Sequence, residues 1–331
     1  MATLGANNLT LADWAKRLDP DGSVAAIAEV LNQTNEIVGD MNLMEGNLPT
    51  GHQTTIRTGL PTPAWRKLNG GVSPTKSTTA QVTEGIGMLE DWVNIDKDEA
   101  ELNGNTAEFR FSEAIAHIEG IGQELASTII YGDNTTAPEE FLGLAPRYNS
   151  LSAANGQNII DCQGAGSDNT SIWLIVHGPQ TFSGIFPKGS KAGILHEDLG
   201  LQTVQTGTGI SGGNLRAYQD HFQVKQGICL KDWRYVVRLA NIDVSNLVSG
   251  SSAADLIQKM VEATHHIPNL DMGKACFYAN RTASKMLDVQ AMEKTNAYLT
   301  VGEEEGKKKV MLRGIPVKKC DAILENEAAV S

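Results

Sequence analysis

Residues 106–131, TAEFRFSEAIAHIEGIGQELASTIIY, carry the clearest periodic pattern in the chain and decide its fold. Apolar or small residues recur there at alternating spacings of four and three, at Phe111, Ile115, Ile118, Gly122, Leu125 and Ile129. This spacing predicts one apolar face on an α-helix about 39 Å long. Asn105 and Glu108 match a capping pair at its start, and Gly132 is a natural stop. A core helix of any globular fold has the same pattern, so the helix alone does not identify a function.

Length and composition are those of an ordinary globular protein. The chain has 331 residues, of which 41% are hydrophobic and 20% charged, enough for one large or two modest domains. A disordered chain would be more polar. With 39 acidic and 27 basic residues the net charge is −12, which argues against a protein that binds nucleic acid by neutralising phosphates.

Two regions before the long helix are too small to bury their apolar side chains alone and need another surface. Residues 1–48 hold two short amphipathic helical candidates, 9–18 and 22–38, separated by the breaker Asp19-Pro20-Asp21-Gly22. Residues 49–97 hold two strand-like runs, HQTTIRTGL and TKSTTAQVTEGIGMLEDWVNID, around the turn-rich PTPAWRKLNGGVSP. They predict a long two-stranded hairpin, which is marginal in water unless it lies on another surface.

After the helix, strands and helices alternate without a repeat period. Strands are expected at 171–178, within 215–244, and at the closing segment VMLRGIPVKKCDAIL, residues 310–324. Helices are expected at 252–267 and 282–294, the second followed by a charged loop, GEEEGKKK. This mixture predicts an α+β fold.

The closest match to an enzyme signature is Ser73-Pro-Thr-Lys76, together with Ser167-Asp168-Asn169. A serine acyl-enzyme needs the serine at the start of a helix and the lysine one turn later on the same face. The residues after Lys76, STTAQVT, are strand-like instead, and the Lys-Thr-Gly element is absent. This reading is a minor alternative, and we assign no catalytic residue.

Three other patterns fit ordinary structural roles better than binding sites. In residues 184–191, Ser190 intervenes where a phosphate loop needs lysine directly after glycine. Asp96, Asp98 and Glu101 resemble a calcium loop, but Glu101 occupies the position that requires glycine. His265 and His266 are adjacent on a helix and point about 100° apart, so they cannot chelate one metal. We therefore expect no metal or cofactor site.

The cysteines and the N-terminus indicate a reduced, non-membrane protein. Cys162, Cys229, Cys276 and Cys320 show no zinc spacing, so we expect reduced and mostly buried thiols. We expect neither a signal peptide nor a membrane-spanning segment, because no basic region precedes an apolar stretch at the N-terminus.

The order of these segments resembles a major capsid protein of tailed bacteriophages with the HK97-like fold. The resemblance rests on the helix 106–131, on Tyr131-Gly132-Asp133 with Pro138 and Phe141-Leu142-Gly143-Leu144, and on Gly314-Ile315-Pro316-Val317. The stretches 46–61, 126–148 and 171–193 are similar to podovirus-type capsid proteins in particular.

The resemblance implies a division of the chain. Residues 1–48 would be an N-terminal arm, 49–97 an extended loop called the E-loop hairpin, and 98–145 a peripheral domain built on the spine helix. Residues 146–309 would be the axial domain with connecting strands, and 310–331 the closing strand of the peripheral domain. Arm and hairpin would lie across neighbouring copies.

The implied function is structural. Copies of the chain would form the hexamers and pentamers of an icosahedral shell around double-stranded DNA, which would lie near the protein without specific binding. The shell would assemble in the bacterial host cytoplasm and become part of the virion.

The implied partners are copies of the chain, a portal, a separate scaffolding protein and a decoration protein. A separate scaffold is expected because the segment before the hairpin is short. Some members of the family crosslink a loop lysine to a neighbour. Lys67 and Lys76 lie in the corresponding loop, but no acceptor can be matched, so we expect no crosslink. An encapsulin-like compartment, with the same fold around enzyme cargo, is the alternative.

Overall fold

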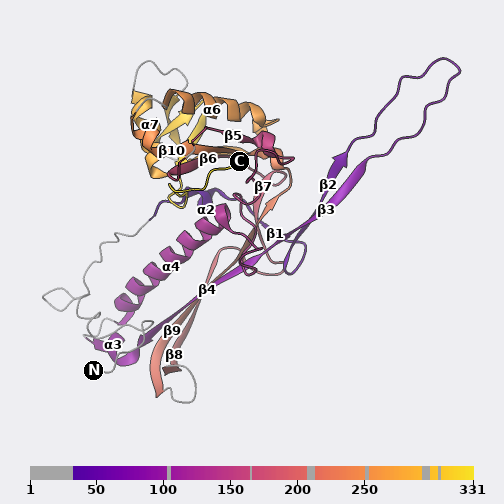
Figure 1. Cartoon of the computed structure of the whole chain (residues 1–331). Coiled ribbons are helices and arrows are strands. Elements are labelled where there is room, and N and C mark those ends of the chain that lie inside the picture. The colour runs from indigo at the N-terminus through magenta and orange to yellow at the C-terminus, as the bar shows by residue number, and fades with distance from the viewer. Residues whose placement is uncertain are drawn as a thin grey trace. The chain divides into compact units, whose positions relative to one another are not determined.

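The computed structural model describes residues 33–102, 106–164, 166–206, 213–249, 253–292, 299–304 and 307–331. The chain divides into two compact units. Of the described residues, the first unit holds Gln33, Thr34, 88–126 and 193–225, and the second holds 35–87, 127–192 and 226–331. Helices and strands are mixed in the order expected for an α+β fold (Figure 1).

The first unit is built from three strands and the first part of the long helix. Its elements are β4 (Gly87–Asp96), α3 (Lys97–Glu101), α4 (Thr106–Tyr131), β8 (Ile194–Thr206) and β9 (Gly213–Leu230). Strands β8 and β9 form an antiparallel hairpin, and β9 pairs with β4 on its other side. Phe109, Val93 and Phe222 are buried in this unit.

Helix α4 confirms the predicted helix 106–131. Its end is fixed by Gly132, whose N–H donates to the Thr128 carbonyl at 2.9 Å. A Cβ at position 132 would lie 2.6 Å from the carbonyl oxygens of Phe141 and Thr128, so only glycine fits this turn. The expected cap at Asn105 lies outside the described residues.

The second unit is built on a sheet in the order β12-β13-β14-β11-β6, with β10 on the other side of β6 and β5 beyond it. Further along, β6 also meets β7, and β7 pairs with β1 and with the end of β9. The strands are β1 (Leu43–Glu45), β5 (Ile159–Asp161), β6 (Asn169–His177), β7 (Phe182–Phe186), β10 (Val236–Asp243), β11 (Lys274–Ala279), β12 (Leu299–Glu304), β13 (Lys307–Leu312) and β14 (Ile315–Lys319).

Helices cover one face of this sheet. They are α5 (Val244–Ser249), α6 (Ala253–His266) and α7 (Arg281–Met292), with the short α2 (Glu36–Asp40) elsewhere in the unit. Met260 of α6 and Leu287 of α7 pack in one core cluster with Leu174 of β6 and Leu239 of β10. Figure 1 shows α6 and α7 above β5, β10 and β6. All nine residues of β6 are buried, which is typical of a strand covered on both faces.

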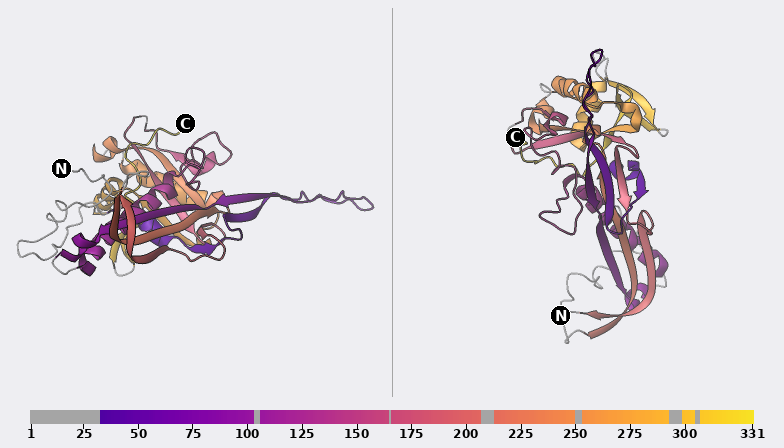
Figure 2. Two further views of the ribbon diagram at one scale, coloured as in Figure 1. Left: turned by 90° about the horizontal axis from the view of Figure 1, so that it is seen from below. Right: turned by 90° about the vertical axis from the view of Figure 1, so that its right-hand side faces the viewer.

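The predicted hairpin is present in the second unit. Strands β2 (Gly51–Gly59) and β3 (Thr78–Gly85) pair antiparallel from Gly51↔Gly85 to Gly59↔Thr78. Residues 60–77 continue beyond the paired strands as a long loop without helix or strand (Figure 2).

Three details of the prediction were wrong. The run expected as one strand, 75–96, is divided at Ile86 into β3 and β4 because Gly85 and Gly87 interrupt it. The closing segment is a hairpin of β13 and β14, since Arg313 and Gly314 take positive φ values of 51° and 84°. Residues 302–304 and 307–309 of the expected charged loop are the paired ends of β12 and β13.

The structure also describes the cysteines, the length and hydropathy of the helices, and part of the N-terminal helical candidates. All four cysteines are free, and Cys229, Cys276 and Cys320 are buried as expected. Within the described residues no helix is both long and apolar enough to cross a membrane. The helical candidate 9–18 lies outside the described residues, and of the candidate 22–38 the structure shows only the start of α2.

Candidate interaction surfaces

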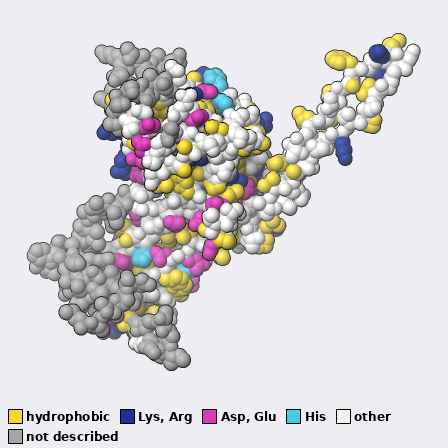
Figure 3. Space-filling model, in the orientation of Figure 1, with side chains coloured by type: hydrophobic (Ala, Val, Ile, Leu, Met, Phe, Trp, Pro, Cys, Tyr) yellow, Lys and Arg dark blue, Asp and Glu magenta, His cyan; other side chains and the backbone are white. Residues whose placement is uncertain are grey.

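The loop 60–77 exposes large apolar side chains. Trp65 and Leu68 are 103% and 94% exposed, and Leu60 is 76% exposed. Between Gly51 and Thr83 the sequence has lysines and arginines but no Asp or Glu. In Figure 3 the projecting hairpin carries hydrophobic and basic side chains on the visible face. An exposed apolar group of this kind marks a surface that another molecule covers.

The root of the hairpin is fixed by a buried ion pair. Both carboxylate oxygens of Glu84 accept from Arg147, at 2.7 and 2.6 Å, and the two side chains are 7% and 15% exposed. Arg147 also donates to the carbonyls of Leu142 and Gly143. The planar guanidinium suits this two-point contact. Strand β3 is thereby held to the loop that follows α4.

A second exposed apolar surface lies on α4 within the first unit. Phe111, Ile115 and Ile118 are 68%, 38% and 41% exposed, whereas Leu125 and Ile129, further along the same predicted stripe, are buried. The stripe is therefore only partly used in the core. Its first half remains available for another surface.

Charged contacts attach α4 to the strands of the first unit. Arg110 donates to Asp220 of β9 at 2.9 Å and to Asp198 of β8 at 2.7 Å. His117 Nδ1 lies 2.5 Å from the Asp91 carboxylate of β4, and its Nε2 lies 3.7 Å from Glu113. Glu113 and Asp91 raise the pKa of His117 to about 8, against the opposing effect of burial.

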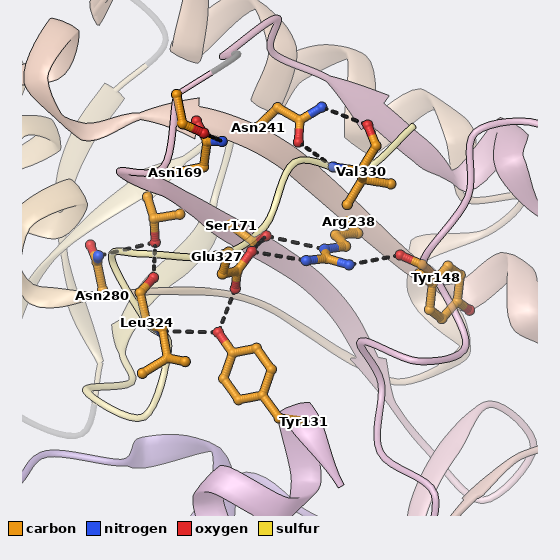
Figure 4. Close-up of polar contacts among 12 residues, drawn as sticks. Tyr131, Tyr148, Asn169, Ser171, Arg238, Asn241, Asn280, Leu324, Glu327 and Val330 are labelled. Carbon is orange, nitrogen blue, oxygen red and sulfur yellow. Dashed lines mark hydrogen bonds and ion pairs between the residues drawn. The ribbon is translucent and has the colours of Figure 1, made fainter. Parts of the chain in front are cut away.

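The second unit contains a buried polar network around Glu327 (Figure 4). Glu327 accepts from Arg238 at 2.8 Å and also from Ser171 and Tyr131. Arg238 further donates to the Tyr148 carbonyl at 2.8 Å. Burial and the Glu327 carboxylate raise the pKa of Tyr131 well above its ordinary value, so Tyr131 remains a donor.

The last residues of the chain are held by the same unit. The Asn241 side chain donates to the Val330 carbonyl at 2.9 Å and accepts from the Val330 N–H at 2.8 Å. The Leu324 N–H donates to Tyr131 at 2.9 Å. These bonds connect the end of α4, the sheet and the C-terminal segment, and their geometry supports a structural role.

The structure does not give the Ser73 and Lys76 pair the geometry of an acyl-enzyme. Both lie in the exposed loop 60–77, and no helix begins at Ser73. Ser167 lies in a bend, Asp168 follows it before the strand begins, and Asn169 is a buried residue of β6.

The remaining sequence patterns have structural roles. Residues 184–186 belong to β7, and Ser190 closes a turn on the Pro187 carbonyl. Asp96 accepts from the Asp98 N–H at the start of α3, and Glu101 pairs with Lys97. His265 lies 3.1 Å from Arg313, and His266 lies 3.9 Å from Glu262. In the described part of the chain no cluster of three or more His, Cys, Asp or Glu could hold a metal.

The sequence reasoning missed the ion pairs of Glu84 with Arg147 and of Glu327 with Arg238. Their partners are 63 and 89 residues apart, and no local pattern connects them. The stripe on α4 had a local signal, because its apolar spacing predicted the helix correctly. The sequence did not indicate that the first half of the stripe is exposed.

Comparison with known proteins agrees with this arrangement. The family model described as Major capsid protein GP7 matches residues 19–331. A chain in the structure of bacteriophage Epsilon15 is 38% identical, with a TM-score of 0.78, and the match covers 100% of this chain and 99% of that one. The bacteriophage JBD30 capsid shares the fold, with 6% identity, a TM-score of 0.50 and coverage of 89% and 93%. No curated protein matches in sequence.

The expected HK97-like α+β fold and the expected structural role are thus confirmed. The chain is a structural subunit of a bacteriophage capsid, and it belongs to the family of the major capsid protein GP7.

Proposed function

We propose that copies of this chain form the hexamers and pentamers of an icosahedral shell around double-stranded DNA. The observation that carries the proposal is the loop 60–77, where Trp65 and Leu68 are almost completely exposed. A stable soluble monomer would not keep such a loop uncovered, because exposed apolar surface favours association. The shell forms by contacts between copies and needs no catalysis.

The receiving surface for the loop is an acidic and apolar surface of a neighbouring copy. The loop is cationic, with Arg66, Lys67 and Lys76. The first unit is rich in Asp and Glu and exposes Phe111 on α4. Opposite charges would orient the two surfaces, and apolar burial would hold them together.

We also propose that the segments have the roles implied by the family. Residues 1–48 are the arm, 49–97 the E-loop hairpin, 98–145 with 310–331 the peripheral domain, and 146–309 the axial domain. The hydrogen bond between Leu324 and Tyr131 supports placing the C-terminal segment with the spine helix. Strand β14 pairs with β11, so under this division the two proposed domains share one sheet.

We further propose that the shell assembles in the host cytoplasm with a portal and a separate scaffolding protein, and that a decoration protein binds it. The net charge of −12 supports a lining that does not bind DNA tightly. An encapsulin-like compartment remains the alternative, and the 38% identity with a phage chain favours the phage capsid.

Electron microscopy combined with size-exclusion chromatography tests the proposal. The full chain is purified after expression alone and after expression with its neighbouring genes. Hexamers, pentamers or closed particles support the proposal. A monomer of 35.5 kDa under every condition would contradict it.

A further inference from the structure

One edge of strand β2 is already paired by a side chain. The Asn47 carboxamide donates to the Gln53 carbonyl at 2.8 Å and accepts from the Gln53 N–H at 2.7 Å. A carboxamide offers the same donor and acceptor as a peptide group. At Gln53, Asn47 therefore makes the two hydrogen bonds that the backbone of a third strand would make there.

The same edge continues without a partner strand. Backbone groups in a strand alternate between its two edges, so the N–H and C=O of Thr55 and Arg57 face the same side as those of Gln53. Strand β3 pairs with the opposite edge of β2. Among the described residues no other strand pairs with β2, so the outer edge at Thr55 and Arg57 is open.

A groove of about 650 Å³ follows this open edge. One wall is the run from Thr54 to Leu60, and the other is formed by Gln180 and the segment from Lys231 to Arg234. Trp233 is half-buried in that second wall and offers an aromatic surface to a side chain of an added strand.

The groove is positively charged. Arg57, Lys231 and Arg234 line it, against the single carboxylate of Asp232. Asp232 accepts from Arg234 at 3.0 and 2.7 Å, so its charge is already compensated. The Lys231 ammonium donates to the Pro179 carbonyl at 2.7 Å, which holds it in place. A chain segment in the groove would therefore gain from carrying carboxylates.

We propose that this groove binds an extended acidic segment of a different protein, which adds to β2 as a third strand. Backbone hydrogen bonds at Thr55 and Arg57 would hold the segment, and the cations around Lys231 would select its acidic side chains. Pairing of the same edge between two copies is disfavoured, since it would bring two cationic grooves together. The proposal concerns the hairpin root and does not rest on the shell contacts of the loop 60–77.

The test uses the purified full-length protein and a fluorescein-labelled seven-residue peptide in which glutamates alternate with valines. Its binding is compared with that of the same peptide carrying lysines in place of glutamates. A third peptide has the glutamate sequence with N-methyl groups on alternate residues, which removes the backbone donors. We expect the glutamate peptide to bind at least about tenfold more tightly than either of the others.

Protein variants locate the site. Thr55→Pro removes the outward N–H without touching the ladder to β3, whereas Thr55→Val keeps it. The first change should abolish binding and the second should preserve it, and Lys231→Glu should weaken binding about tenfold or more. Thr55→Pro could lose binding through a folding defect. The methylated peptide tests the same backbone hydrogen bonds on the unaltered protein, so the proposal stays testable in that case.

Three results would overturn the proposal. They are no binding of the glutamate peptide, equal binding of the lysine or methylated peptide, and full binding to Thr55→Pro. If Thr55→Pro also prevents the self-association of the chain, the edge serves contacts between copies instead, and the proposal also fails.

Discussion

Glu84 and Arg147 form a two-point ion pair at the root of the hairpin, with oxygen–nitrogen distances of 2.7 and 2.6 Å. The pair connects β3 to the loop after α4 inside the second unit, where both side chains are almost excluded from solvent. A marginal two-stranded hairpin thereby acquires a fixed base. The exposed loop beyond it can project because its root is held.

Removing one partner of this pair should destabilise the protein. Arg147→Met leaves the Glu84 carboxylate buried and uncompensated, so the free energy of unfolding should fall by about 3 kcal/mol. Urea unfolding of the full chain measures this. Arg66→Met, a change in the exposed loop, is the control and should change stability by less than about 0.5 kcal/mol. Equal stability of the Arg147 variant and the unaltered chain would contradict the assigned role.

Polar substitutions in the loop should affect assembly and leave folding intact. Trp65→Ser combined with Leu68→Ser removes apolar surface that is almost completely exposed, so the free energy of unfolding should change by less than about 0.5 kcal/mol. Shell formation should be strongly reduced in size-exclusion chromatography. Trp65→Phe keeps an aromatic group and should assemble. Normal shells from the double variant would show that the loop is not a contact.

The first unit should lose stability in mildly alkaline solution. The folded-state pKa of His117 is raised from 6.5 to about 8, so protonated His117 stabilises the fold fully below pH 6.5. That contribution, about 1–2 kcal/mol, is lost as the pH rises through 8. Chemical unfolding at pH 6.5 and at about pH 9 measures the difference. His117→Gln should reduce it, whereas the control His265→Gln should leave it unchanged.

The buried network should depend on the charge of Glu327. Glu327→Gln leaves Arg238 in a site where both side chains of the pair are 5% exposed, and should lower unfolding stability by about 3 kcal/mol. Differential scanning calorimetry measures the shift. Glu139→Gln, an exposed substitution, is the matched control. A variant as stable as the control would show that Ser171 and Tyr131 hold the site without the charge.

Mature particles should contain no covalent crosslinks through Lys67 or Lys76. Both lysines lie in the exposed loop, and no acceptor can be identified for them. Particles boiled in detergent should therefore run as one band at 35.5 kDa on a denaturing gel. A ladder of multiples that disappears in the double variant Lys67→Arg, Lys76→Arg would contradict this.

Local patterns were enough to predict the elements whose signal is local. The stripe in 106–131 gave α4 correctly because its apolar spacing and its glycine stop lie within a few turns. The turn at Arg313-Gly314 also has a local signal, because a glycine stands between strand-like residues. The prediction of one continuous strand did not use it. The resemblance to a known family supplied the shell function.

Long-range partners could not be predicted in this way. Arg147 has several loop neighbours that could accept its hydrogen bonds, and only the fold selects Glu84, 63 residues earlier. The side-chain pairing of Asn47 with Gln53 lies within six residues, yet its consequence for the edge of β2 depends on the opposite wall at Lys231. Such sites arise from packing of distant segments.

The most direct test of the central claim is a cryo-electron microscopy reconstruction of the assembled particle at side-chain resolution. The claim is that the loop 60–77 is a contact between copies. We expect Trp65 and Leu68 to be buried against a neighbouring copy, with basic loop residues beside its acidic side chains. A closed shell in which this loop extends into solvent would contradict the claim.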